Sequence, residues 1–149
     1  MWIEKYHFLT VLITMLVVIT AVLSHYEGLR FFTNWMSRSK LRPRLRIVAM
    51  IYGLLFLHTI EIWIFGITFW LLTGDTGFGT LASQSELIYV YDYVYFSATV
   101  YSTLGFGDII PAGPLRLLVG IESVTGLLMI TWSASFTYLE MIQYWRKGN

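Results

Sequence analysis

The sequence predicts an all-α membrane protein with three transmembrane helices and one shorter, re-entrant helix between the second and the third. Of the 149 residues, 56% are hydrophobic and only 13% are charged, which is about half the charged share of a soluble domain. Three apolar stretches are long enough to cross a hydrocarbon core about 30 Å thick. A fourth apolar stretch, residues 87–104, lies between the last two spans. The 42 residues between Leu72 and Leu115 cannot hold two further spans with their turns, so we expect this stretch to cross only half of the membrane.

The three predicted spans cover residues 8–24, 47–72 and 115–140. The first span has no charged residue. The second contains His58 and Glu61, and the third contains Glu122. Ionisable residues are costly inside a membrane, so each of these three is a candidate for a functional role.

The loop after the first span sets the predicted orientation. Residues 25–46 hold six of the ten basic residues and one acidic residue, Glu27. Such a loop is typical of the cytoplasmic side, which places the N-terminus and residues 73–114 outside and the C-terminus inside. The alternative is that the first span is a cleaved signal peptide, which would leave the basic loop outside. Within the loop, residues 29–41 fit either an interfacial helix or an ordinary basic loop.

The stretch from Asp92 to Pro111 carries the most informative motif. Asp92 is a suitable N-cap, and residues 93–102 contain no glycine or proline, so a short helix over residues 92–102 is expected. The Thr-Leu-Gly-Phe-Gly sequence of residues 103–107 then breaks the helix. Non-helical backbone at membrane depth is tolerated only where it is buried in protein or lines a water-filled path.

A cation that crosses the membrane loses its water shell, and a row of backbone carbonyl oxygens can replace the lost ligands. Such a row requires a backbone that alternates between right-handed and left-handed conformations, and Gly105 and Gly107 adopt positive φ at little steric cost. The hydroxyl of Thr103 adds a further oxygen. One strand supplies only part of a coordination shell, so we expect several copies around a symmetry axis. The negative C-terminal end of the helix before the motif favours a cation at the same place.

The Thr-Leu-Gly-Phe-Gly-Asp sequence of residues 103–108 resembles the potassium-channel signature T-V-G-Y-G-D, from which Leu104 and Phe106 depart. The resemblance implies a homotetramer in the lipid bilayer in which K⁺ binds at Thr103, Leu104, Gly105 and Phe106, with Gly107 completing the filter. It also implies two parts in the chain. Residues 1–46 form an N-terminal transmembrane helix with a basic cytoplasmic loop. The pore domain covers 47–149, with outer helix 47–72, turret 73–91, pore helix 92–102, filter 103–107 and inner helix 115–140.

The same resemblance assigns supporting roles around the filter. It pairs Tyr95, on the pore helix, with Asp108, which follows the filter. It places Glu122 behind or just below the filter, hydrogen-bonded to Thr99 or another pore-helix hydroxyl. The alternatives are a plain surface carboxylate at Asp108 and a protonated, satisfied carboxyl at Glu122.

The resemblance also assigns roles along the third span. Gly126 matches the glycine at which inner helices of this family bend, although close helix packing is an equally ordinary use of a small residue. The cavity-lining positions are Leu127, Ile130, Ala134 and Tyr138. Their three- and four-residue spacing puts them on one stripe of a helix.

Depth along the helices groups three ionisable residues. His58 and Glu61 are three residues apart and share a helix face. At 1.5 Å per residue, Glu61 and Glu122 lie at nearly the same depth in the membrane. We therefore predict a buried polar cluster of His58, Glu61 and Glu122. The alternative is a His–Glu pair that ties the first span to the second.

Other functions are disfavoured. The chain has no cysteine and no recognisable motif of a hydrolase, metalloprotease or nucleotide-binding enzyme, so we predict no enzymatic activity and no cofactor besides the permeant K⁺. No nucleic-acid partner is expected. A non-selective cation channel and a proton-coupled transporter that uses His58, Glu61 and Glu122 are the alternatives. The second Gly-Phe-Gly, at residues 77–79, has no helix before it and is interpreted as a flexible turret. So compact a chain suggests a bacterial inner membrane.

Overall fold

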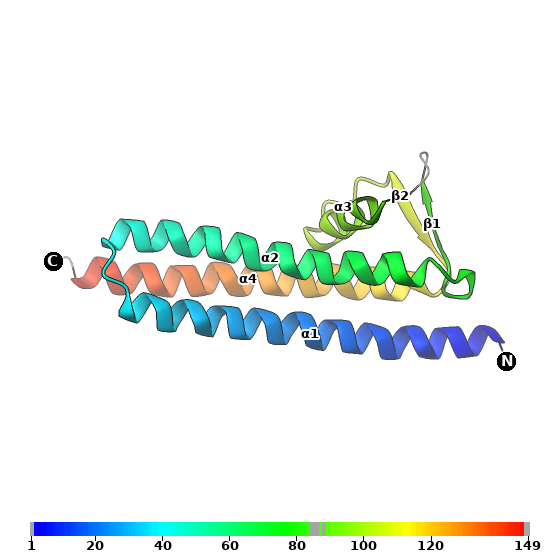
Figure 1. Ribbon diagram of the computed structural model, residues 1–149, viewed down its shortest axis with the longest axis horizontal. Helices are drawn as coiled ribbons and strands as arrows, with labels where there is room; N and C mark the ends of the chain where they lie inside the picture. Colours follow the sequence, from blue (N-terminus) through cyan, green and yellow to red (C-terminus); the bar gives the residue numbers. More distant parts are fainter. Residues whose placement is uncertain (1, 84–86, 88, 148–149) are drawn as a thin grey trace.

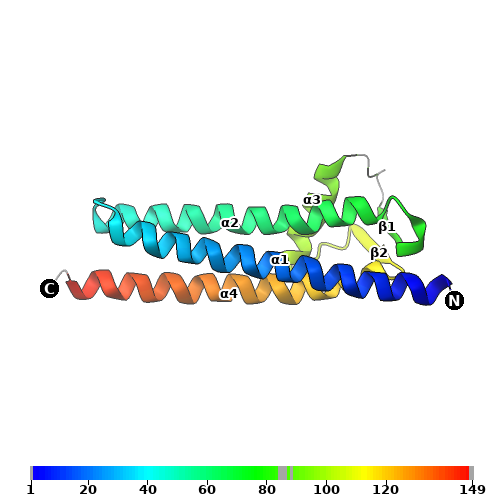
Figure 2. The same cartoon turned by 60° about the horizontal axis from the view of Figure 1, so that its bottom comes forward.

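Three long helices lie side by side, and a short helix with a two-stranded ribbon covers one end of them (Figures 1 and 2). The computed structural model describes residues 2–83, 87 and 89–147. The elements in chain order are α1 (Trp2–Arg38), α2 (Pro43–Leu72), η1 (Thr76–Phe78), β1 (Thr80–Ser83), α3 (Val90–Tyr101), β2 (Ile109–Ala112) and α4 (Leu115–Lys147). Three segments are long and apolar enough to cross a membrane: Glu4–Arg38, Arg44–Leu72 and Leu115–Gln143. The predicted fold class is confirmed.

Helix α1 extends well beyond the predicted span of residues 8–24. It continues to Arg38, so most of the predicted cytoplasmic loop is helical. Leu29 and Met36 are buried in an apolar cluster with residues of α2, and Phe32 packs against the same cluster. Their three- and four-residue spacing forms a stripe that faces α2. Both interpretations of residues 29–41 were therefore wrong up to Arg38, because this segment continues a packed helix.

Helices α2 and α4 are also longer than predicted. Pro43 occupies the first turn of α2, where its missing N–H costs no hydrogen bond. Helix α2 ends at Leu72, as expected. Helix α4 continues to Lys147. The basic ends of both helices therefore lie at the end of the bundle opposite α3 (Figure 1).

Helix α3 begins two residues before the predicted start. Its N-cap is Tyr89, not Asp92. Asp92 lies in the first turn, where its carboxylate Oδ2 accepts a hydrogen bond from the Tyr89 backbone N–H at 2.9 Å. The carboxylate thus still stabilises the positive end of the helix. The N-cap prediction was wrong because an acidic side chain three residues after the N-cap can also accept a hydrogen bond from the backbone N–H of the N-cap residue.

The segment between α2 and α3 contains a short 3₁₀ helix and a strand. The Asp75 side chain accepts a hydrogen bond from the Gly77 N–H at 2.9 Å. Strand β1 pairs antiparallel with β2, with Thr80 opposite Ala112 and Ser83 opposite Ile109. The turret therefore contains regular structure, and its flexibility stays a prediction. The ribbon joins residues 80–83, before α3, to residues 109–112, after the Gly-Phe-Gly motif of residues 105–107. It therefore holds both ends of the segment that contains α3 and the motif.

The main apolar core lies where α3 meets the long helices. Its largest members are Phe65, Phe69, Phe96, Tyr101, Leu115 and Leu118. Helices α2 and α3 approach closely at Gly66, where an added Cβ would lie 2.8 Å from the Val94 Cα. This packing fixes the position of α3 and of the segment that follows it.

Candidate ion-conducting site

The backbone after α3 alternates between residues with positive φ and residues without it. Thr103, Gly105 and Gly107 have φ values of 62°, 53° and 78°, and the residues between them, Leu104 and Phe106, do not have positive φ. In the described part of the chain, Thr103 is the only residue other than glycine with positive φ. A left-handed conformation costs an ordinary residue about 1–2 kcal/mol. Alternation of this kind is what a row of carbonyl ligands around an ion path requires.

The start of this segment is tied to the last turn of α3. The Thr103 N–H donates to the Val100 carbonyl at 2.9 Å, and the Gly105 N–H donates to the Thr99 carbonyl at 3.0 Å. Thr99 therefore supports the segment through its backbone. Its hydroxyl donates to the Phe96 carbonyl at 2.8 Å, so the predicted bond between Thr99 and Glu122 was wrong.

The end of the segment is held by a side-chain contact. The Tyr95 hydroxyl donates to Asp108 Oδ2 at 2.8 Å, which is the pair predicted from the sequence. This hydrogen bond raises the pKa of the Tyr95 phenol above its ordinary value of 10.0, with smaller contributions from burial and from the charge of Asp108. Tyr95 lies on α3, so both ends of the segment depend on the same short helix.

A single chain leaves this segment bare. Residues 102–108 are all exposed, and the apolar side chains of Leu104 and Phe106 are each 64% exposed. A Cβ added at Gly105 or Gly107 would meet no atom within 4 Å. Two large apolar side chains that lie this exposed are unusual on the surface of a protein.

Glu122 is fully buried but does not join the predicted cluster with His58 and Glu61. Its Oε1 lies within hydrogen-bond distance of the Ser97 hydroxyl on α3, which also contacts the Ile62 carbonyl at 2.9 Å. The prediction failed because equal depth along two helices does not fix which face each side chain occupies. The more general expectation, a bond from a pore-helix hydroxyl, is met by Ser97.

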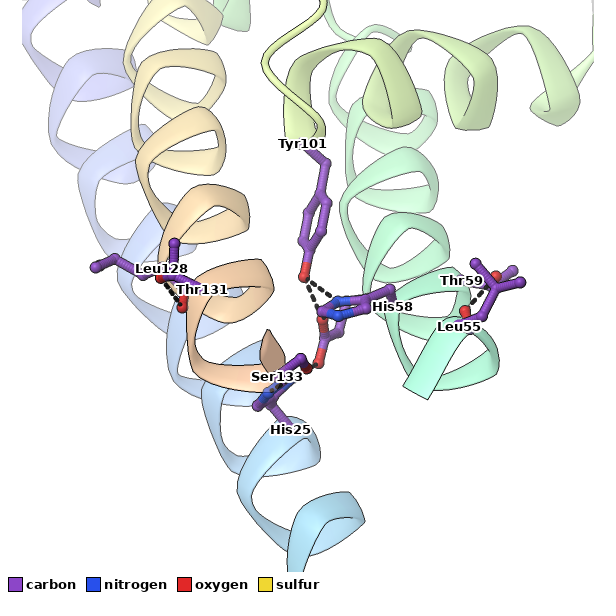
Figure 3. A network of polar contacts seen from close by, with 9 residues as sticks. His25, Leu55, His58, Thr59, Tyr101, Leu128, Thr131 and Ser133 are labelled. Atoms are coloured by element: carbon purple, nitrogen blue, oxygen red, sulfur yellow. Dashed lines mark hydrogen bonds and ion pairs between the residues drawn. The ribbon is translucent and has the colours of Figure 1, made fainter. Parts of the chain in front are cut away.

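His58 and Glu61 instead meet residues from two other helices, α1 and α3, and Figure 3 shows His25, His58 and Tyr101 close together. His25 Nδ1 on α1 lies 2.8 Å from Glu61 Oε1, and His58 Nδ1 lies 3.2 Å from Glu61 Oε2. The Tyr101 hydroxyl at the end of α3 donates to Glu61 Oε2. Ser133 on α4 contacts His25 Nε2 at 3.3 Å. The alternative expectation, a His–Glu pair between the first two spans, is the arrangement present, although its histidine is His25.

Sequence reasoning missed His25 and Tyr101. His25 follows the predicted end of the first span by one residue and was assigned to a loop. Its heptad spacing from Val18 and from Phe32, both of which face the bundle interior, is a signal that the helix continues. Tyr101 carries no distinct signal in the sequence, because an aromatic residue at the end of an apolar helix is common.

The comparison with known families agrees with this geometry. A family model described as "Ion channel" matches residues 57–142, more than half of the chain. The protein belongs to this ion channel family. Searches of curated proteins and of solved structures found no match. The matched residues of the channel run from α2 through α3 and the alternating segment to α4, and leave α1 outside.

Gly126 of the channel packs directly against α3. A Cβ at this position would lie 2.1 Å from the Tyr101 carbonyl oxygen, so the residue serves close helix packing. Its role as a bending point stays a prediction. The predicted cavity-lining residues Leu127, Ile130, Ala134 and Tyr138 are all exposed in the single chain, and their lining role also stays a prediction.

Proposed function

We propose that this channel conducts K⁺ passively through a filter built from residues 103–107 of four identical chains. The observation that carries the proposal is the alternation of positive φ at Thr103, Gly105 and Gly107 with ordinary φ between them. The left-handed conformation is unfavourable for Thr103, which is not a glycine. The alternation is the conformation that a carbonyl-lined ion path requires.

The proposed K⁺ ligands are the carbonyl oxygens of Thr103, Leu104, Gly105 and Phe106, with the Thr103 hydroxyl at the inner end. These oxygens substitute for the water shell of the ion. Helix α3 ends at Tyr101, two residues before Thr103, so the negative end of its dipole favours a cation there. The bond between Tyr95 and Asp108 supports the outer end of the filter.

Four copies give the filter its closed form. A cyclic arrangement surrounds the strand with identical strands, and it covers Leu104 and Phe106 with protein from α3 and its neighbours. The stripe from Leu127 to Tyr138 then faces the common axis and lines a cavity below the filter. Bending at Gly126 would open or close that cavity.

The outer mouth is acidic. There is no Lys or Arg in residues 73–115, whereas Asp75, Asp92 and Asp108 all belong to this segment. Four copies of these carboxylates raise the local cation concentration. The Tyr6 hydroxyl on α1 contacts Asp75 Oδ2 at 3.1 Å, so the start of α1 lies on the same side as the mouth. We place this side outside the cell and the basic ends of α2 and α4 in the cytoplasm, in a bacterial inner membrane.

The alternatives have less support. A proton-coupled transporter requires a relay, but Glu122 contacts Ser97 and forms no hydrogen bond or ion pair with His58 or Glu61 in the described part of the chain. A non-selective cation channel does not need the strained φ at Thr103, since a wide, hydrated path imposes no spacing on its ligands. These geometries favour a selective K⁺ channel.

Flux into liposomes tests the proposal. The purified protein is reconstituted, and uptake of ⁸⁶Rb⁺ is measured with K⁺ or Na⁺ as competitor. We expect K⁺ to compete and Na⁺ to compete poorly. Gly105→Ala should abolish uptake, because alanine is strained at φ 53°. The matched control is Gly74→Ala, an exposed glycine of the turret without positive φ. Equal competition by Na⁺, or full uptake by Gly105→Ala, would contradict the proposal.

A further inference from the structure

Outside the filter, the most unusual feature is the convergence of His25, His58 and Glu61 in the apolar interior. Each offers one ligand atom, and these atoms all lie within 4.8 Å of one another. His25 and Glu61 are fully buried, and the His58 side chain is 16% exposed. Figure 3 shows the side chains of His25 and His58 directed toward the same point from α1 and α2, with Tyr101 above and Ser133 beside them.

Hydrogen bonding alone does not account well for the spacing in this group. His58 Nδ1 lies 3.2 Å from Glu61 Oε2 and 2.9 Å from the Tyr101 hydroxyl, and that hydroxyl also contacts Glu61 Oε2. The three atoms form a triangle with three close edges. The phenol and the imidazole supply at most one hydrogen each, so one edge has no hydrogen of its own.

The same spacing suits a coordination shell. Tetrahedral Zn²⁺ binds nitrogen and oxygen ligands at about 2.0–2.1 Å, which places neighbouring ligand atoms about 3.3 Å apart. The separations between His25 Nδ1 and Glu61 Oε1, 2.8 Å, and between His58 Nδ1 and Glu61 Oε2, 3.2 Å, are close to this value. Because the ligand atoms of all three residues already lie within 4.8 Å of one another, they would need to move toward a common centre to hold a small ion.

The ligand types select the metal. Two imidazoles and one carboxylate form a set that Zn²⁺ uses in proteins. Imidazole favours Zn²⁺ and its transition-metal neighbours over Mg²⁺ and Ca²⁺, which prefer sites made of oxygen alone. The Tyr101 oxygen is a fourth ligand within reach. The Glu61 carboxylate offsets part of the ionic charge, which an apolar interior requires.

A second layer of contacts orients the ligands. The Ser133 hydroxyl contacts His25 Nε2 at 3.3 Å, which leaves Nδ1 to face the group. Such outer contacts on the second ring nitrogen are a regular feature of metal-binding histidines. The ring of Trp132 also packs near the His25 ring, with centroids 5.2 Å apart. The partly exposed side chain of His58 provides a route of entry.

We propose that His25, His58 and Glu61, with Tyr101 as a further ligand, bind one divalent transition-metal ion of the Zn²⁺ class per chain. The ion ties α1 to α2 and to the end of α3, two residues before Thr103. Helix α1, which lies outside the matched ion-channel residues, is thereby attached to the conducting part of the protein. This inference does not depend on which ion the filter passes.

Binding of Zn²⁺ alone tests the proposal on protein without a polyhistidine tag, reconstituted in lipid nanodiscs. Titration calorimetry and elemental analysis measure affinity and stoichiometry. We expect one Zn²⁺ per chain, unaffected by excess Mg²⁺, and a loss of affinity of at least about tenfold in His25→Asn, His58→Asn and Glu61→Gln. The matched controls are His7→Asn and Glu122→Gln. His7 is exposed and is the one histidine outside the proposed site, and Glu122 is the other fully buried carboxyl of the described residues. Both should bind Zn²⁺ as the unaltered protein does.

A measurement on the unaltered protein guards against variants that do not fold. Co²⁺ bound by nitrogen and oxygen atoms in a tetrahedral site gives strong visible absorption, and Zn²⁺ should remove it. An unaltered protein that binds no Zn²⁺, or that gives only the weak spectrum of six-coordinate Co²⁺, overturns the proposal and leaves a hydrogen-bonded network. Loss of binding in His7→Asn, or unchanged binding in folded His25→Asn, overturns it equally.

Discussion

At the scale of single residues, the hydrogen bond between Tyr95 and Asp108 tests how the filter is supported. Tyr95→Phe removes only the hydroxyl that contacts Asp108 Oδ2. We expect ⁸⁶Rb⁺ uptake to fall several-fold, because the outer end of the filter loses its link to α3. The control is Tyr91→Phe, an exposed tyrosine of the same helix whose ring packs edge-on against Trp63, a contact that phenylalanine keeps. Equal uptake by the two variants would show that the bond does not support conduction.

The same bond predicts a dependence on alkaline pH. The hydrogen bond to Asp108 raises the pKa of Tyr95 above 10.0. A raised pKa in the folded state means that the stabilisation is fully present below the ordinary pKa and is lost as pH rises through the raised one. The difference in thermal midpoint between the unaltered protein and Tyr95→Phe should therefore be constant up to pH 10.0 and shrink above it. A difference that does not shrink at any pH above that value would contradict this assignment.

At the scale of elements, the contact between α3 and α4 depends on a glycine. In Gly126→Ala the new Cβ would meet the Tyr101 carbonyl oxygen at 2.1 Å, and neither helix backbone yields easily. We expect a loss of about 1–3 kcal/mol of stability, measured by thermal unfolding in detergent. Gly120→Ala is the control on the same helix, because its Cβ would meet no atom within 4 Å. A helical alanine there should be neutral or slightly stabilising.

The Gly126 variant also separates packing from bending. If Gly126→Ala unfolds at the temperature of the unaltered protein but conducts less, the residue acts as a hinge and the predicted clash is relieved in the folded protein. If stability and conduction fall together, close packing against Tyr101 explains both. The temperature scan and the flux assay on one preparation therefore give an answer in either case.

The elements also show how far the sequence can be interpreted. The three spans, the short helix and the alternating segment follow from apolar length, from Gly105 and Gly107, and from the absence of helix breakers in residues 93–102. The end of α1 does not follow, because the stripe that contains Leu29 and Met36 is too sparse to register as a membrane span. The partners of Glu122 do not follow either, because depth along a helix says nothing about rotation around it. His25 does not follow from the sequence because it lies in the part of α1 beyond the recognisable span. Ser97 does not follow because the rotation of Glu122 around its helix is not known from the sequence.

At the scale of the whole molecule, the proposed filter requires an assembly. Leu104 and Phe106 are each 64% exposed in one chain, and one chain supplies only part of a coordination shell. In the proposed tetramer, neighbouring copies would supply both the cover and the remaining ion ligands. Native mass spectrometry should therefore detect four chains of 17.3 kDa, or about 69 kDa of protein. A monomer as the main species would remove the basis of the proposed filter.

Mixed assemblies provide a functional count of the same copies. Gly105→Ala should distort one strand of the filter, and one distorted strand is enough to stop an ion that needs ligands from all sides. When unaltered and variant chains are co-expressed in equal amounts and mix at random, a tetramer retains about one sixteenth of the flux, a dimer about one quarter and a monomer about one half. Different tags on the two chains, purified in sequence, show that the variant enters the assembly. A residual flux near one sixteenth supports four strands around one path, whereas a value near one half would mean that each chain conducts alone.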